Sequence, residues 1–446
     1  MRFLAAAVGL SAALSLVTPD AEASALPFKI ITHELDNGLR LVLVPRPGSG
    51  LIAYYSVVRV GSRDETEPGV TGFAHFFEHM MFRGTKDWSP KRVSAFLKKT
   101  GADQNGFTTD DFTCYTFFGL SGHLDELVQM EADRFQHLVY TEDVFKTESR
   151  AVLGEYNKSS SSPSLPLRER LRGEVFTRHT YGHTTLGYLK DIEAMPDKYA
   201  YSKTFFERFY TPDNTTIIAV GDFDPARLEA LVERHYGGWS SRRAARKIET
   251  EPAQTAEVRS DIEWPNPTLP ILSMSWRTPA TNFQSKDTAV YNLLFELLFG
   301  ETSPLYTGLV LDEQVVQGFS EWSWNHVDPY LFHVVARLRS AAQFTDVERA
   351  ISAQIAKLRS GVVDEAQLEA VKSRVRYGLL LDLATPSRIA SALAFQIGAG
   401  GDPGSLDTLL ETINEVTVDD VERFARLYLN DAGRSVVKLA AKETQK

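Results

Sequence analysis

Residues 72–82 read GFAHFFEHMMF, and this stretch predicts a helix that places His75 and His79 on one face. Side chains four residues apart stack one turn above another, and Glu78 shares that face because it follows His75 by three residues. Two imidazoles in this arrangement can bind one divalent metal such as zinc. A carboxylate beside them can accept a proton from a water molecule at the metal.

The remaining positions of this stretch are apolar on nearly every side, which is typical of a helix inside a domain. Two histidines and a glutamate are costly to bury there without partners. One interpretation is a set of satisfied core histidines. The order His-x-x-Glu-His favours a metal centre instead, because it is the signature of the inverted zinc peptidases. A catalytic zinc also needs a third protein ligand and an open position.

The third ligand must come from elsewhere in the chain, and the best candidates lie in residues 147–156, which read TESRAVLGEY. Glu148 and Glu155 are seven residues apart, so a helix places both on one face. Local chemistry does not choose between these two carboxylates. A solvated helix face would explain the pair equally well.

Together these residues resemble the pitrilysin-like family of metallopeptidases, which includes insulin-degrading enzyme and the mitochondrial processing peptidases. The resemblance covers nearly the whole chain after its N-terminal segment. It implies that Glu155, 76 residues after His79, is the third zinc ligand and that Glu148 supports the site. It also implies an α+β fold of two related domains, each an antiparallel or mixed sheet packed with helices, that form half of a clamshell.

Residues 104–111, which read QNGFTTDD, match a family stretch that forms the edge of a sheet. In the family a peptide substrate lies along this edge as an added strand, held by main-chain hydrogen bonds. The resemblance therefore implies that Asn105 and Gly106 bind substrate. The alternative is an ordinary Asn-Gly turn. The only cysteine, Cys114, follows in a strand-like run, where we expect it to be a buried small hydrophobe.

Length and charge limit the remaining possibilities. A chain of 446 residues predicts two or more domains. The composition, 43% hydrophobic and 24% charged, is that of a globular protein. The net charge of −10 argues against nucleic acid as a partner.

Residues 1–25 predict a secretory signal peptide. Arg2 precedes a short apolar run, Leu4–Val17, and small residues follow at a suitable cleavage position. A membrane anchor is the alternative, but the run is short of a full span. We therefore expect a soluble, exported protein, periplasmic or secreted, with no membrane span after signal removal.

The domain organisation follows from a polar linker and a weak internal repeat. We expect a zinc-binding α+β domain at 26–240, a linker at 241–266 and a second, related α+β domain without metal at 267–446. The segments 207–209 and 422–424 both read ERF, and each precedes a β-branched strand. Only the first half contains His-x-x-Glu-His.

One segment departs from the resembled family. Members whose later domains complete the active site carry an Arg and a Tyr that hold the substrate at the metal. The matching segment, 309–317, has Val310 and Gln317 at those positions. A transition state needs donors aimed at the developing oxyanion. We therefore expect a second, homologous chain to supply them in a hetero-oligomer that encloses a chamber.

The predicted function is that of a zinc-dependent endopeptidase with one Zn²⁺ per chain, acting on peptides or unfolded polypeptides. Glu78 is the predicted general base, and Glu148 the predicted orienting carboxylate. Two alternatives remain. The chain could be an inactive structural or chaperone-like subunit of a peptidase complex, or a metal-dependent protein that binds peptides without cutting them.

Overall fold

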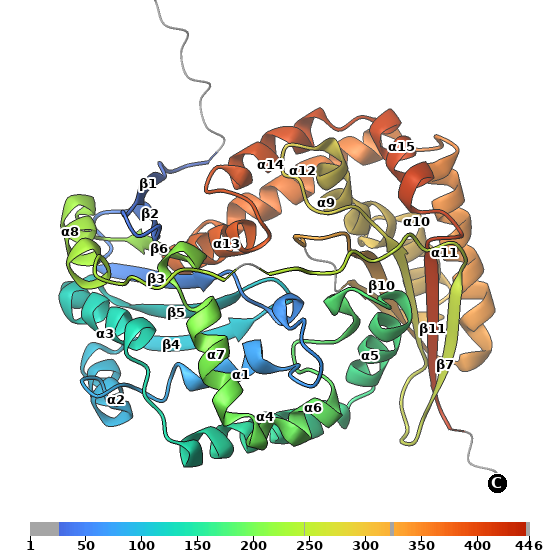
Figure 1. Cartoon of the computed structure of the whole chain (residues 1–446). Helices are drawn as coiled ribbons and strands as arrows, with labels where there is room; N and C mark the ends of the chain where they lie inside the picture. Colours follow the sequence, from blue (N-terminus) through green and yellow to red (C-terminus); the bar gives the residue numbers. More distant parts are fainter. Residues whose placement is uncertain (1–25, 245, 322–324, 443–446) are drawn as a thin grey trace, which may run out of the picture.

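A computed structural model describes residues 26–244, 246–321 and 325–442 of the chain (Figure 1). The expected signal peptide at 1–25 lies outside the described residues. The expected α+β fold with two related parts is confirmed, because helices pack on two separate sheets. Among the described residues, no helix combines the length and the apolar character that crossing a membrane requires.

The first sheet has six strands in the order β1-β2-β6-β3-β5-β4. β2 and β6 are parallel, and every other neighbouring pair is antiparallel. β4 forms one edge of this sheet. The strands are β1 (Ile31–Glu34), β2 (Arg40–Pro45), β3 (Leu51–Val58), β4 (Asp103–Thr108), β5 (Thr113–Leu120) and β6 (Thr215–Gly221).

The second sheet has five strands in the order β7-β11-β8-β10-β9. β7 and β11 are parallel and the other pairs are antiparallel. The pattern of the first sheet is thus repeated, without a counterpart of β1. The strands are β7 (Val258–Trp264), β8 (Ile271–Arg277), β9 (Val316–Glu321), β10 (Leu331–Leu338) and β11 (Arg434–Ala441).

Each half covers one face of its own sheet with its own helices. In the first half these helices form one large apolar core with the sheet. They include α1 (Phe73–Met80), α2 (Pro90–Thr100), α3 (Leu124–Gln136), α4 (Glu142–Ser160), α6 (Leu189–Ala194), α7 (Tyr199–Phe209) and α8 (Pro225–Tyr236). The second half does the same with α9 (Lys286–Phe299), α10 (Pro304–Tyr306), α11 (Phe344–Arg359), α12 (Glu365–Asp382) and α15 (Val418–Tyr428).

The opposite face of each sheet is covered by a helix from the other half. α13 (Pro386–Gly398) lies over β3 and β6 of the first sheet and is backed by α14 (Ser405–Glu415). α5 (Ser164–Val175) lies against β11 and β7 of the second sheet. Figure 1 shows both helices in these positions. The two domains expected as contiguous segments therefore exchange a helix in each direction, because each sheet has two apolar faces to bury.

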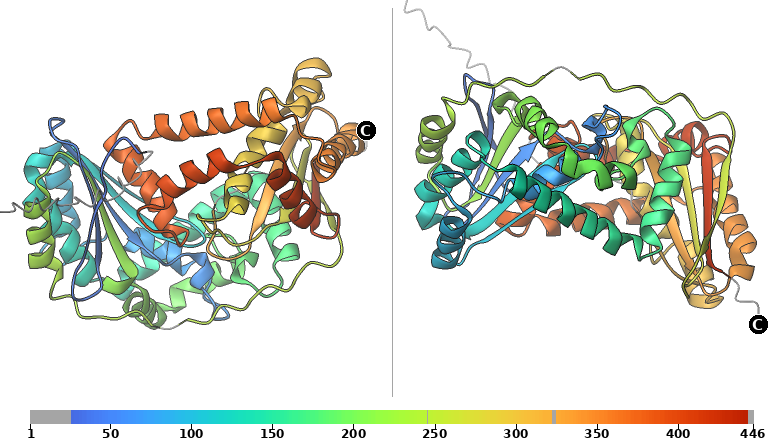
Figure 2. Two further views of the ribbon diagram at one scale, coloured as in Figure 1. Left: turned by 90° about the horizontal axis from the view of Figure 1, so that it is seen from above. Right: turned by 60° about the horizontal axis from the view of Figure 1, so that its bottom comes forward.

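The expected linker at 241–266 is too long at its C-terminal end. β7 lies inside that range and pairs in parallel with β11. Exposed charged residues alternate with less exposed residues along β7, because only one face of this strand is covered. The many polar residues make the strand look like a linker in the sequence. The extended part of the linker, before β7, runs along one edge of the molecule from α8 toward the second sheet (Figure 2).

Candidate metal centre

The helix α1 begins at a position that requires glycine. Gly72, its N-cap, has φ +91°, and a Cβ there would lie 2.7 Å from the carbonyl oxygen of Leu186. The Glu65 carboxylate accepts hydrogen bonds from the amides of Gly72 (2.8 Å) and Ala74 (2.7 Å). It thereby satisfies donors that the first turn of a helix leaves without partners.

Buried aromatic rings fix the orientation of α1. Phe73, Phe76 and Phe77 have no exposed surface, and the ring of Phe77 stacks on that of Phe205 with centroids 5.2 Å apart. With those faces turned into the core, the face carrying the two histidines points toward α4. The rings of His75 and His79 lie 4.9 Å apart there.

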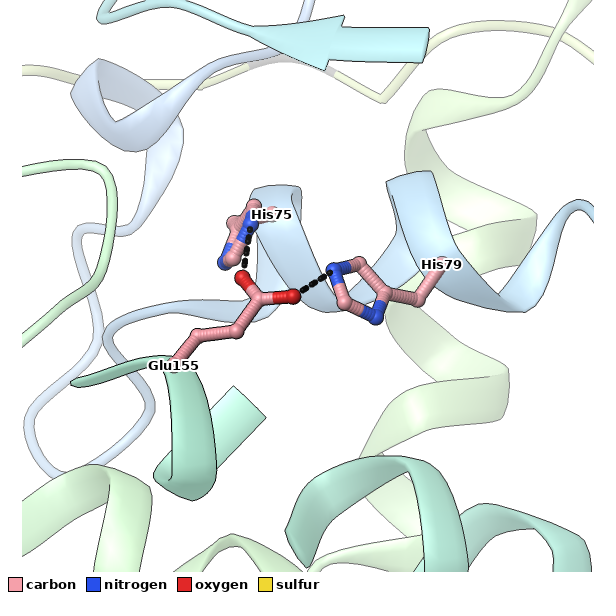
Figure 3. A group of neighbouring side chains, drawn as sticks. All are labelled: His75, His79 and Glu155. Carbon is pink, nitrogen blue, oxygen red and sulfur yellow. Dashed lines mark ion pairs between the residues drawn. The ribbon is translucent and has the colours of Figure 1, made fainter. Parts of the chain in front are cut away.

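The structure brings Glu155 of α4 to both histidines (Figure 3). Its Oε2 lies 3.4 Å from Nε2 of His75, and its Oε1 lies 3.4 Å from Nε2 of His79. One donor atom from each residue can be chosen so that all lie within 4.8 Å of one another. Ligands on a tetrahedral zinc with bonds of about 2.05 Å are about 3.3 Å apart. The donor set therefore fits a zinc ion.

The protonation state of His75 suits a metal ligand. Burial and the neighbouring His79 lower the pKa of His75 to about 4, so its ring is neutral at pH 7. A neutral imidazole has a lone pair available for a metal. Among the described residues its Nδ1 atom is buried and has no hydrogen-bond partner.

The second carboxylate of α4, Glu148, lies beside His79 and is nearly buried. Its Oε2 is 3.7 Å from Nδ1 of His79, and its Oε1 accepts from Nη2 of Arg83 at 2.6 Å. Burial opposes ionisation of Glu148, but His79 and Arg83 outweigh it and lower the pKa of Glu148. The contact with Glu148 raises the pKa of His79 in turn. Glu148 thus lies within ion-pair distance of the ring of His79, in the position from which a supporting carboxylate orients a ligand in metal sites.

The predicted base, Glu78, lies between the metal cluster and the edge strand β4. Thr108 of β4 donates a hydrogen bond from its Oγ1 to Oε2 of Glu78 at 2.8 Å. Burial raises the pKa of Glu78 above its usual value. Gly106 of β4 passes so close that a Cβ there would lie 3.0 Å from Cγ of Glu78.

The structure places Asn105 and Gly106 within β4, so the alternative of an ordinary turn at this pair is wrong. Their strand is the edge of the first sheet, beside Glu78. Sequence reasoning missed two functional neighbours, Thr108 and Arg83. Arg83 follows His79 by four residues, a spacing that could have indicated a group on the same helix face.

His179, His326 and the cysteine lie outside this cluster. Nε2 of His179 lies 2.9 Å from Asp328, and Nε2 of His326 lies 3.1 Å from Asp110. Cys114 is buried in β5. Within the described residues, only His75, His79 and Glu155 gather as a possible metal-ligand group.

Comparisons with known proteins find related families and related chains. The family model "Insulinase (Peptidase family M16)" matches residues 53–188, which include the whole cluster, and "Peptidase M16 inactive domain" matches residues 199–375. The zinc protease PqqE of Helicobacter pylori is 27% identical, over 97% of this chain and 98% of that protein. The probable mitochondrial-processing peptidase subunit beta of Schizosaccharomyces pombe is 25% identical, over 91% and 88%.

Solved structures show the same fold. A protease from Helicobacter pylori has a TM-score of 0.86 at 24% identity, covering 93% of this chain and 99% of that one. The periplasmic protease PqqL from Escherichia coli has a TM-score of 0.76 at 19% identity, covering 94% of this chain but only 48% of that one. The chain belongs to the insulinase family of peptidases, family M16.

Proposed function

We propose that this chain is a zinc-dependent endopeptidase that hydrolyses peptides or unfolded polypeptides. The observation that carries this proposal is the convergence of His75, His79 and Glu155, each histidine 3.4 Å from the carboxylate, with Glu78 beside them. Core histidines that only pack and form hydrogen bonds would not require a further, half-buried carboxylate with a raised pKa. Relatives that are named zinc proteases support the same conclusion.

In this proposal His75, His79 and Glu155 hold one zinc ion per chain. When bound, zinc polarises the scissile carbonyl and lowers the pKa of a water molecule toward about 7. Glu148 keeps the ring of His79 in place through Nδ1, and Arg83 keeps Glu148 ionised. The ligand face is thus fixed before substrate arrives.

Glu78 acts as the general base. Its carboxylate takes the proton of the attacking water and passes it to the leaving amine. The hydrogen bond from Thr108 occupies Oε2 and leaves Oε1 to take that proton. Burial raises the pKa of Glu78 toward neutral pH, and a pKa near the working pH makes proton transfer efficient in both directions.

The substrate binds as an extra strand along β4. An edge strand offers main-chain donors and acceptors to an extended peptide, and β4 has such an edge next to Glu78. Asn105 and Gly106 supply these contacts. The absence of a side chain at Gly106 lets the backbone pass close to the base.

A second, homologous chain completes the active site. Val310 lies in a π-helical turn, Thr307–Asp312, and its side chain has no donor for an oxyanion. Gln317 lies in β9 and offers a neutral amide in place of the tyrosine hydroxyl. The match to half of the longer PqqL chain supports an assembly of two such units. The mitochondrial relative is itself named a subunit.

Export from the cytoplasm is part of the proposal. Residues 1–25 have the composition of a signal peptide, and the structural relative PqqL is a periplasmic protease. Mass spectrometry of the protein purified from its native source should find a mature N-terminus near residue 25. A chain that retains Met1 would contradict export.

The test is Glu78→Gln in the purified protein, with zinc measured by elemental analysis. We expect full zinc content and a peptidase rate lower by about 10²–10⁴-fold. Glu296→Gln on α9, a matched change on a helix without the cluster, should keep the wild-type rate. The assay is run with and without proteins that co-purify from the native extract. Wild-type rates in Glu78→Gln, or wild-type protein inactive under both conditions, would contradict an endopeptidase; robust turnover by the chain alone would contradict the partner.

A further inference from the structure

A cavity of about 420 Å³ lies where the two halves and the linker meet, and none of the metal-centre residues lines it. We call it the seam cavity. Its wall contains an unusual number of guanidinium groups for a chain with net charge −10. They are Arg59 and Arg63 after β3, Arg243 and Arg246 in the linker, and Arg277 at the end of β8.

Two of these arginines are neutralised by carboxylates of the protein. Arg63 donates through Nε to Asp328 at 2.5 Å, and Arg246 forms an ion pair with Asp64. Asp328 also faces Nε2 of His179 at 2.9 Å. These pairs leave no excess positive charge on their side of the cavity.

The other carboxylates of the wall are also engaged. Glu251 accepts from the backbone amides of residues 177–179. Asp111 accepts from the hydroxyl of Tyr181 at 2.6 Å and from the amide of Val327 at 3.2 Å. The remaining one, Glu249, is exposed, so solvent and salt screen its charge.

Three arginines of the wall have no carboxylate of the described residues within ion-pair distance. In the part of the chain that the structure describes, no ion pair involves Arg59, Arg243 or Arg277. Arg59 donates from Nη2 to the carbonyl of Asp213 at 2.7 Å, while its Nε is buried without a hydrogen-bond partner. The guanidinium of Arg277 donates to the carbonyl of Val175 at 3.4 Å and lies over the ring of Phe176, 4.7 Å from its centroid. Burial lowers the pKa of Arg277, and the charge of Glu251 offsets this only in part.

The surroundings oppose the charge of Arg59. Burial and the nearby cations Arg40, Arg243 and Arg246 lower the pKa of Arg59 to about 10. A buried donor that lacks a partner and cations that repel one another both cost free energy. A bound anion would remove both costs.

We propose that the seam cavity binds a small multivalent anion bearing phosphate or carboxylate groups, held by Arg59, Arg243 and Arg277. The planar fork of a guanidinium matches the oxygens of either group in a two-point contact. The volume of about 420 Å³ is that of a small-molecule site. Because these arginines come from the first half, the linker and the second half, the anion links all three.

The test is calorimetric titration of the full mature chain, at constant ionic strength, with inorganic pyrophosphate and separately with citrate. We expect saturable binding of at least one at a single site, and the stronger of the two identifies the anionic group. Arg243→Gln should weaken this binding at least tenfold. The matched control is Arg242→Gln, because Arg242 is the exposed neighbour in the same linker and does not line the cavity.

A second variant guards against misfolding. Arg277→Gln removes a guanidinium from the other half and should weaken binding similarly, while both variants keep the wild-type zinc content and peptidase rate, since neither residue touches the metal centre. The proposal is overturned if the wild-type protein binds neither anion saturably. It is also overturned if Arg242→Gln weakens binding as much as Arg243→Gln, because attraction to the linker's charge alone would explain that result.

Discussion

The two halves of this protein share a sheet topology but differ in the helix that follows the central strand. In the first half β3 leads to α1, with His75, Glu78 and His79 on its inner face. In the second half β8 leads to α9, whose residues include no histidine. The same architecture therefore exists with and without a ligand set. Both halves place a helix after the central strand, and the halves differ in whether that helix carries side chains of the candidate site.

The halves are alike in a different respect, because each depends on the other for a helix. α13 covers the first sheet and α5 covers the second. If either half stood alone, one apolar face of its sheet would be exposed to water. We infer that the half with the candidate metal centre needs the other half to remain folded.

Replacing a zinc-ligand side chain on α1 should change zinc content and peptidase rate far more than a substitution on α9. His75→Ala removes one of two imidazoles, so the chain should lose its zinc, and its peptidase rate should fall at least as far as in Glu78→Gln, by about 10⁴-fold. Asn292→Ala on α9 should change neither quantity. Elemental analysis with a peptide-cleavage assay measures both. Retention of stoichiometric zinc by His75→Ala would remove the distinction between the two helices.

A buried carboxylate, Asp110, joins the two halves, and its removal should lower the free energy of unfolding strongly. Asp110 accepts from Arg172 at 2.8 Å and faces Nε2 of His326 at 3.1 Å. Asp110→Asn leaves the buried guanidinium of Arg172 without its carboxylate partner, so we expect a loss of about 3–5 kcal/mol in the free energy of unfolding. Denaturant titration measures it. Asp346→Asn, which affects an exposed pair with Arg349, should cost less than about 1 kcal/mol.

The same pair predicts a pH dependence. Burial alone would raise the pKa of Asp110, but Arg172 and His326 outweigh it and hold the pKa well below its usual value. A depressed folded-state pKa adds stability above the unfolded value of about 3.9 and loses it as pH falls below that value. The wild-type advantage over Asp110→Asn should therefore shrink below about pH 4. An advantage that stays constant down to pH 2 would contradict the ion pair.

The exchanged helices can be tested by matched cavities. Leu393 of α13 and Leu167 of α5 are both fully buried. Leu393→Ala and Leu167→Ala should each cost about 2–5 kcal/mol and should lower one common unfolding transition. Leu427→Ala, at a residue 54% exposed, should have little effect. Calorimetry that shows two independent transitions, with only one shifted by each variant, would show that the halves fold separately.

The smallest expected effect concerns the edge strand. Thr108→Val removes the hydrogen bond to Glu78, which favours the ionised carboxylate, so the pKa of Glu78 should rise. The acidic limb of the kcat/KM profile should move to higher pH, with up to about a tenfold loss of rate at pH 7. Zinc content should not change. Thr32→Val on β1, at the opposite edge, is the control; an equal pH shift there would exclude a local cause.

Much of the candidate metal centre could be predicted because its geometry is local. The spacing of His75, Glu78 and His79 within one helix fixes their common face whatever the rest of the chain does. Glu155 was different, since only a family resemblance selected it over Glu148. The structure supplies the reason that sequence could not. Glu155 reaches both imidazoles, whereas Glu148, two turns earlier on α4, reaches only Nδ1 of His79 and is held there by Arg83.

The sequence by itself therefore determined the two α+β halves, the common face of His75, Glu78 and His79 on one helix, and the half that carries it, because repeating patterns and short spacings encode these features locally. Only the tertiary structure decided which side chains from distant segments meet. Thr108 reaches Glu78 across 30 residues, and α5 and α13 each cover the sheet of the other half. Such contacts depend on which apolar faces remain to be buried once each sheet has formed, and no local pattern records that choice.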